Sequence, residues 1–138
     1  MRWMILPLRR YFDFGGRSCR TEFWSFFMLQ WIAVMALFVW IYRALVAVGM
    51  QGETHQAVST FSLSVGPALS LFGLFVILTF IPSIAVQVRR FHDQDLSGWL
   101  VLLNLVPGIG GLIVLVFMCL KGTSGSNRFG PDPLDYAD

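Results

Sequence analysis

Charged residues are scarce in this chain and are absent from three long stretches of it. Only 13% of the 138 residues are Asp, Glu, Lys or Arg, about half the share of an ordinary soluble domain. Residues 23–42, 54–88 and 96–120 contain none of them, together 80 residues. A bilayer core about 30 Å thick needs roughly 20 helical residues to cross it, so each stretch is long enough. This pattern excludes a soluble fold and predicts an all-α, polytopic membrane protein with one domain.

Cysteine and net charge are also low, and each shortage removes a class of function. Cys19 and Cys119 are the two cysteines, and their positions do not suit a metal site, so we expect structural thiols. A net charge of +2 is too small to indicate nucleic-acid binding. The basic residues are better explained as signals of membrane topology.

Three membrane spans are predicted, with a broken third one. The segments expected are an interfacial amphipathic piece over residues 2–16, spans over 21–48, 61–88 and 97–120, and a polar tail over 121–138. Five arginines precede the first span, the loop after it has no Lys or Arg, and Arg89 and Arg90 follow the second span. Because Lys and Arg are enriched in cytoplasmic loops, this alternation predicts a cytoplasmic N-terminus.

Helix-breaking residues interrupt the second and third stretches. Pro82 lies deep in the second and is expected to kink it. The middle of the third contains Pro107, Gly108, Gly110 and Gly111, which leave backbone groups that need partners at membrane depth. Either this helix is kinked but crosses, or two arms of about ten residues form a re-entrant hairpin that returns the tail to the cytoplasm. The sequence favours the kinked crossing, because Pro and Gly are common in membrane helices.

Charged residues gather in the polar segments that flank the apolar stretches. Arginine binds carboxylates through a planar fork of N–H groups, so opposite charges there are predicted to pair as an interhelical polar latch. The same cluster could instead hold a lipid phosphate or another anionic ligand. The candidate residues are Arg17, Arg20, Glu22, Arg89, Arg90, His92 and Asp93.

Catalytic and cofactor motifs are not apparent. His92 and Asp93 could form an acid–base pair, but no nucleophile with an orienting partner accompanies them. No second His or Cys lies at metal-ligand spacing, and the glycine-rich tail has neither a P-loop nor a dinucleotide fingerprint. We therefore predict no catalytic residue, no metal and no cofactor.

Association is the leading functional hypothesis. Aromatic residues make up 15% of the chain and provide large contact area at low entropic cost. We predict a non-enzymatic accessory subunit or membrane-organising partner, in contact with lipids and with other membrane proteins or copies of itself. The alternatives are an oligomeric transporter or channel component, with Gln30 and Asn104 as its mid-membrane polar residues, and an anionic-lipid-binding protein.

Three ordered motifs in the polar segments resemble a known family. They are Gly16-Arg17 with Arg20-x-Glu22-Phe23-Trp24, then Arg89-Arg90-Phe91-His92-Asp93 with Ser97-Gly98-Trp99, and finally Lys121-Gly122 with Gly125-x-Asn127-Arg128-Phe129-Gly130-Pro131-Asp132-Pro133. They are similar to the YhaH/YhaI-like bacterial inner-membrane family, known as domain of unknown function 805, over about residues 11–133. The chain departs from the family pattern in having Phe91 where Leu is usual. The resemblance implies a protein of the bacterial cytoplasmic membrane and implies no established reaction. Separately, a third span that crosses the membrane would place the tail in the periplasm.

Overall fold

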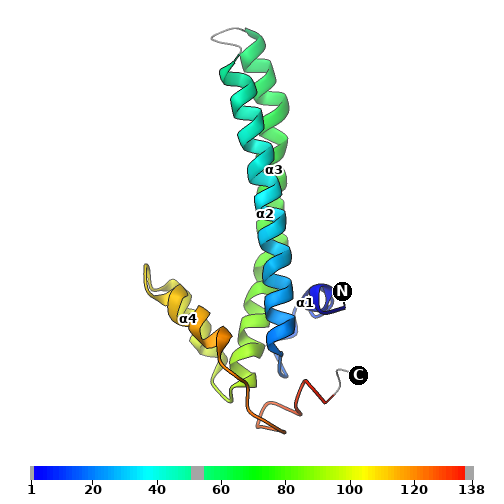
Figure 1. The fold of residues 1–138 in the computed structure, drawn as a ribbon, viewed down its shortest axis with the longest axis vertical. Coiled ribbons are helices and arrows are strands. Elements are labelled where there is room, and N and C mark those ends of the chain that lie inside the picture. Colours follow the sequence, from blue (N-terminus) through cyan, green and yellow to red (C-terminus); the bar gives the residue numbers. More distant parts are fainter. Residues whose placement is uncertain (1, 51–54, 136–138) are drawn as a thin grey trace. The chain divides into compact units, whose positions relative to one another are not determined.

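The computed structural model describes residues 2–50 and 55–135, and its regular elements are all helical (Figure 1). In chain order they are α1 (Arg2–Arg9), α2 (Arg20–Gly49), α3 (His55–Asp93), the 3₁₀ helix η1 (Gly98–Leu105) and α4 (Gly110–Cys119). The predicted all-α class is confirmed. Two helical segments are long and apolar enough to cross a membrane, Arg20–Gly49 and Phe61–Asp93. The helix of α3 continues through Pro82, which is buried.

The described chain divides into two compact units. Unit 1 contains residues 1–27 and 80–138, and unit 2 contains residues 28–79. In unit 2 the buried residues include the small Ala44 and Ala68 together with Val65, whereas Phe38 and Leu63 are 63% and 77% exposed. Small residues let helix backbones approach closely, and lipid is as apolar as the large side chains that face it. Unit 2 therefore has the surface of a membrane-spanning helix pair.

The third apolar stretch is broken at its Pro-Gly segment, and the break reverses the chain direction. The two arms, η1 and α4, pack against each other (Figure 1). Gly110 makes this packing possible, because a Cβ there would lie only 1.7 Å from the carbonyl oxygen of Leu103. Gly108 lies in the turn with φ at 82°, a conformation that favours glycine. Each arm is about 15 Å long, roughly half of the hydrocarbon thickness.

Contacts of the residues after α4 correct the prediction of a kinked crossing. The carbonyl oxygen of Leu120 accepts hydrogen bonds from Arg20 and Arg90, and the Asn127 amide donates to the carbonyl of His92. A chain that crossed the bilayer over residues 97–120 would hold these groups on opposite sides. In the structure this stretch turns back as a hairpin instead, and the tail contacts the arginine segments.

Candidate functional site

Unit 1 contains a buried cluster of charged side chains from segments far apart in the sequence. Each is at most 5% exposed: Arg17, Glu22, Arg89, Arg90 and Asp93. A buried charge is costly unless it is paired and hydrogen-bonded. The structure brings together these five of the seven residues predicted from the sequence and pairs them in two groups. We call this cluster the polar latch.

Glu22 and Arg89 form the first group, which connects the start of α2 to the end of α3. Oε1 of Glu22 accepts a hydrogen bond from Nη2 of Arg89 at 3.0 Å, and Oε2 accepts one from Oγ of Ser18 at 2.8 Å. Nη1 of Arg89 donates to the carbonyl oxygens of Arg10 and Asp13. One guanidinium thus holds the segment after α1, the first turn of α2 and the last turns of α3 together.

Asp93 is the centre of the second group and binds two guanidinium groups. Its Oδ1 lies 3.0 Å from both Nε and Nη2 of Arg17, and its Oδ2 accepts from Nη1 of Arg90. The other N–H groups of Arg17 donate to the carbonyl oxygens of Thr123 and Gly125 in the tail. The backbone carbonyl of Asp93 also accepts from the amide of Thr123 at 2.8 Å. Asp93, in the second motif, therefore links the first motif to the third.

The chain can approach Asp93 this closely only because residue 122 is glycine. A Cβ at Gly122 would lie 2.0 Å from Oδ2 of Asp93. Just before it, the carbonyl of Leu120 follows the last turn of α4, where carbonyl groups lack partners within the helix. Arg20 and Arg90 supply those partners. Arg20 itself is exposed and lies at the edge of the latch.

His92 packs in an aromatic stack and does not join the ion pairs. Its ring lies parallel to that of Phe129, with ring centroids 3.9 Å apart and an interplanar angle of 4°. Nδ1 of His92 is 3.3 Å from the carbonyl oxygen of Gly16, so Nδ1 is the donor in that contact because a carbonyl can only accept. His92 therefore contacts residues of both the first and the third motif.

The tail contributes contacts that the sequence reasoning missed. Asn127 and Gly130 exchange backbone hydrogen bonds at 3.0 and 3.1 Å, which close a tight turn. Arg128 in this turn pairs with Asp95 at 3.0 Å. The signal was present in the glycines of the third motif, since Gly125 and Gly130 have positive φ. A crossing third span would have placed the tail on the other side of the membrane, so these contacts were not expected.

Asn104, a predicted mid-membrane polar residue, lies on the re-entrant hairpin. Its amide donates to Oε1 of Gln87 on α3 at 2.8 Å and to the carbonyl of Val101 at 3.0 Å. These hydrogen bonds connect the first arm of the hairpin to the second long helix.

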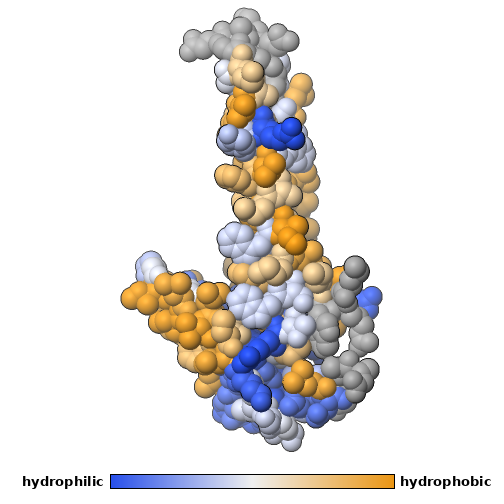
Figure 2. Space-filling model, in the orientation of Figure 1, coloured by the Kyte–Doolittle hydropathy of each residue, from blue (hydrophilic) through white to orange (hydrophobic). Residues whose placement is uncertain are grey.

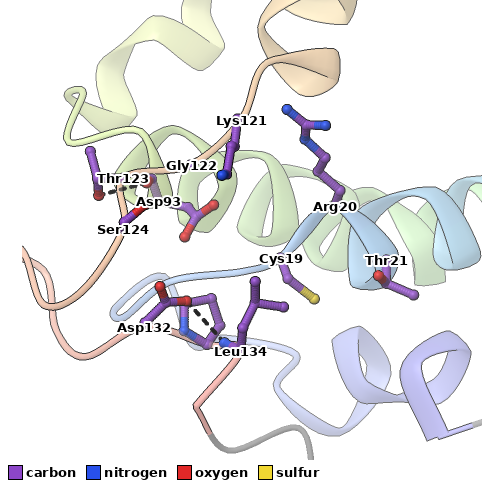
Figure 3. A pocket seen from close by; sticks show the side chains of 11 residues that line it. Cys19, Arg20, Thr21, Asp93, Lys121, Gly122, Thr123, Ser124, Asp132 and Leu134 are labelled. Carbon is purple, nitrogen blue, oxygen red and sulfur yellow. Dashed lines mark hydrogen bonds between the residues drawn. The ribbon is translucent and has the colours of Figure 1, made fainter.

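A cavity of about 370 Å³ lies beside the latch (Figure 3). We call it the tail cavity, and its lining residues are Cys19, Arg20, Thr21, Asp93, Lys121, Gly122, Thr123, Ser124, Asp132, Pro133 and Leu134. Burial raises the pKa of the Cys19 thiol. Hydrogen bonds from the backbone amides of Leu134 and Gly125 lower the pKa of the Asp132 carboxyl, and the nearby cations act in the same direction.

Known proteins are similar in sequence to most of this chain. Residues 11–131 match the family described as "Protein of unknown function (DUF805)". The chain belongs to this family. It is 40% identical to the inner membrane protein YhaH of Escherichia coli K12 over 134 residues, which cover 96% of this chain and 97% of YhaH. It is 36% identical to the inner membrane protein YhaI of the same strain over 133 residues, 96% of each chain. No solved structure matches this chain.

The family resemblance predicted from the three motifs is therefore confirmed. Its relatives are inner membrane proteins, in agreement with the two apolar helices of membrane-spanning length. The buried ion pairs are made by motif residues: Arg17, Glu22, Arg89, Arg90 and Asp93. The motifs of this chain thus coincide with the contacts that hold unit 1 together.

Proposed function

We propose that this integral inner-membrane protein acts by association, as an accessory subunit or organising partner of a larger membrane assembly. The observation that carries the proposal is the polar latch. The charged residues of the three motifs make contacts with one another and with backbone carbonyls, which is the arrangement of a structural element. The latch sets how the hairpin and the tail attach to the ends of α2 and α3.

Buried ion pairs supply little net stability, because their desolvation opposes the attraction between the charges. Their best-attested use is to select one arrangement over others. Here the selected arrangement has a polar surface next to an apolar hairpin. Figure 2 shows hydrophilic residues gathered at the polar end of unit 1, beside the hydrophobic surface of η1 and α4. A surface of this kind suits a protein that presents a fixed face to a partner at the membrane boundary.

The membrane-facing residues of unit 2 also favour association. Trp31, Ile32 and Phe38 are each more than half exposed, and aromatic side chains offer large, rigid contact areas. Two spanning helices and a half-depth hairpin enclose no pathway by themselves. Any activity across the bilayer therefore needs further copies or another membrane protein.

Crosslinking from unit 2 tests the proposal. A single cysteine replaces Phe38 in a protein that lacks Cys19 and Cys119, and the control has its cysteine at Ala68, which is fully buried. We expect disulfide-linked or crosslinked species in native membranes from the Phe38 position only, together with an oligomer or complex by native mass measurement in mild detergent. A monomeric protein with no crosslink from either position would refute association.

The orientation that we propose places both the N-terminus and the tail in the cytoplasm, because four arginines precede α2, Arg20 begins it, and Arg89 and Arg90 lie in the last turns of α3. Single cysteines at Ser126 and Met50, both exposed, test it with an impermeant maleimide. Intact cells should be labelled at position 50, whereas position 126 should react only after permeabilisation. Labelling of position 126 in intact cells would contradict this orientation.

A further inference from the structure

The tail cavity contains a second kind of charged group, different from the buried pairs of the latch. Arg20 and Lys121 line it and are exposed, in contrast to the buried arginines. Figure 3 shows these two residues on one side of the cavity and Asp132 with Leu134 on the opposite side. Three hydroxyl side chains also line it: Thr21, Thr123 and Ser124. Cations with hydroxyl donors around one concave space are the groups that bind oxyanions.

The two carboxylates of the cavity do not cancel its positive charge. Asp93 is already bound by Arg17 and Arg90. Asp132 accepts hydrogen bonds from the backbone amides of Gly125 at 3.2 Å and Leu134 at 3.0 Å. Arg17 and Arg90 do not line the cavity, but with Arg20 and Lys121 they make four positive side chains around its two carboxylates. The excess of positive charge selects an anion rather than a metal ion.

The cation of Arg20 is held in place before any ligand arrives. Its Nε donates to the carbonyl oxygen of Leu120 at 2.9 Å, which fixes the guanidinium at the end of α4. Lys121 follows Leu120 directly, so its side chain starts beside the carbonyl that holds Arg20. Groups that are already ordered lose less entropy on binding, and this favours affinity.

We infer that the tail cavity binds a phosphate group, with Arg20 and Lys121 as its charged ligands. The phosphate belongs either to the headgroup of an anionic phospholipid or to a soluble phosphate ester. Leu134 lines the cavity and Leu120 precedes its Lys121, and both apolar side chains are exposed, which suits a site at the edge of the hydrocarbon layer. This ligand adds to the association proposed above and does not depend on it, because the cavity lies within unit 1 of a single chain.

Binding to the purified full-length protein tests the inference in two arms. The lipid arm uses nanodiscs of phosphatidylcholine with or without phosphatidylglycerol, and native mass spectrometry after release counts the retained lipid. The soluble arm titrates inorganic phosphate and glycerol phosphate at low salt, followed by phosphorus NMR. The test variant is Arg20→Gln with Lys121→Gln. A first control, Arg20→Lys with Lys121→Arg, keeps both charges. A second control, Arg43→Gln with Arg9→Gln, removes two exposed positive charges that lie on α2 and α1, outside the cavity.

We expect the Gln pair to weaken binding at least about tenfold, since two charge-assisted contacts are lost. The charge-keeping pair should stay within about threefold, and added salt should weaken binding to the wild type, because both cations are exposed. Retention of phosphatidylglycerol alone identifies a headgroup site, and binding of the soluble esters alone identifies a soluble ligand. Equal binding by the wild type and the Gln pair overturns the inference, as does an equal loss in the Arg43→Gln and Arg9→Gln control. Oligomeric state, measured on the same samples, reports on association separately.

Discussion

Separate and joint removal of Glu22 and Arg89 is the sharpest test of the polar latch. The two side chains are 2% and 0% exposed and lie 3.0 Å apart. Loss of one partner leaves the other buried without its counter-charge, which typically costs about 3–5 kcal/mol. Arg89→Met also leaves the carbonyl of Asp13 without its donor, which adds about 1–3 kcal/mol. Glu22→Leu and Arg89→Met are therefore each expected to destabilise the protein strongly.

The double variant is expected to cost less than the two single variants together. With both charges gone, two apolar side chains occupy the site and no unpaired charge remains, so the coupling free energy should be about 2–3 kcal/mol. Unfolding in mixed micelles of dodecyl maltoside and dodecyl sulfate, followed by tryptophan fluorescence, measures all four proteins. Single costs below about 1 kcal/mol, or costs that add, would show that the pair does not hold unit 1 together.

Further predictions concern glycines and thiols in unit 1. Gly122→Ala should lower the free energy of unfolding by about 2–4 kcal/mol, because its Cβ would displace a latch carboxylate. Gly110→Ala should destabilise by about 1–3 kcal/mol by forcing the hairpin arms apart, and Gly111→Ala, which meets no atom within 4 Å, is the control for both in thermal unfolding. Cys19 should react with maleimide far more slowly than the exposed Cys119 at neutral pH, because burial raises the pKa of its thiol and keeps it protonated. The fold holds the Cys19 thiol protonated, so stability is fully present below the usual pKa of a thiol and is lost as the pH rises from there through the raised pKa of Cys19. Equal labelling rates in the two single-cysteine proteins would contradict the burial.

The sequence predicted which residues form the site, but not which of them contact one another. Arg17, Glu22, Arg89 and Asp93 stand out in the sequence because they are charges beside long uncharged stretches. Nothing local indicates that Arg17 contacts Asp93, 76 residues away. The hydrogen bonds of Arg17 to the tail span more than 100 residues. They were missed because the third stretch was expected to cross the bilayer.

The sequence by itself determined that this protein lies in a membrane, that it is helical, and to which family it belongs. Those properties depend on sums over neighbouring residues, so hydropathy and ordered motifs report them directly. Tertiary structure alone decided whether residues 97–120 cross the membrane or turn back. Both conformations bury the same apolar residues and break at Pro107. The choice between them depends on which partners the end of α4 and the tail meet, and Arg17, Arg20 and Arg90 provide those partners only once the helices have packed.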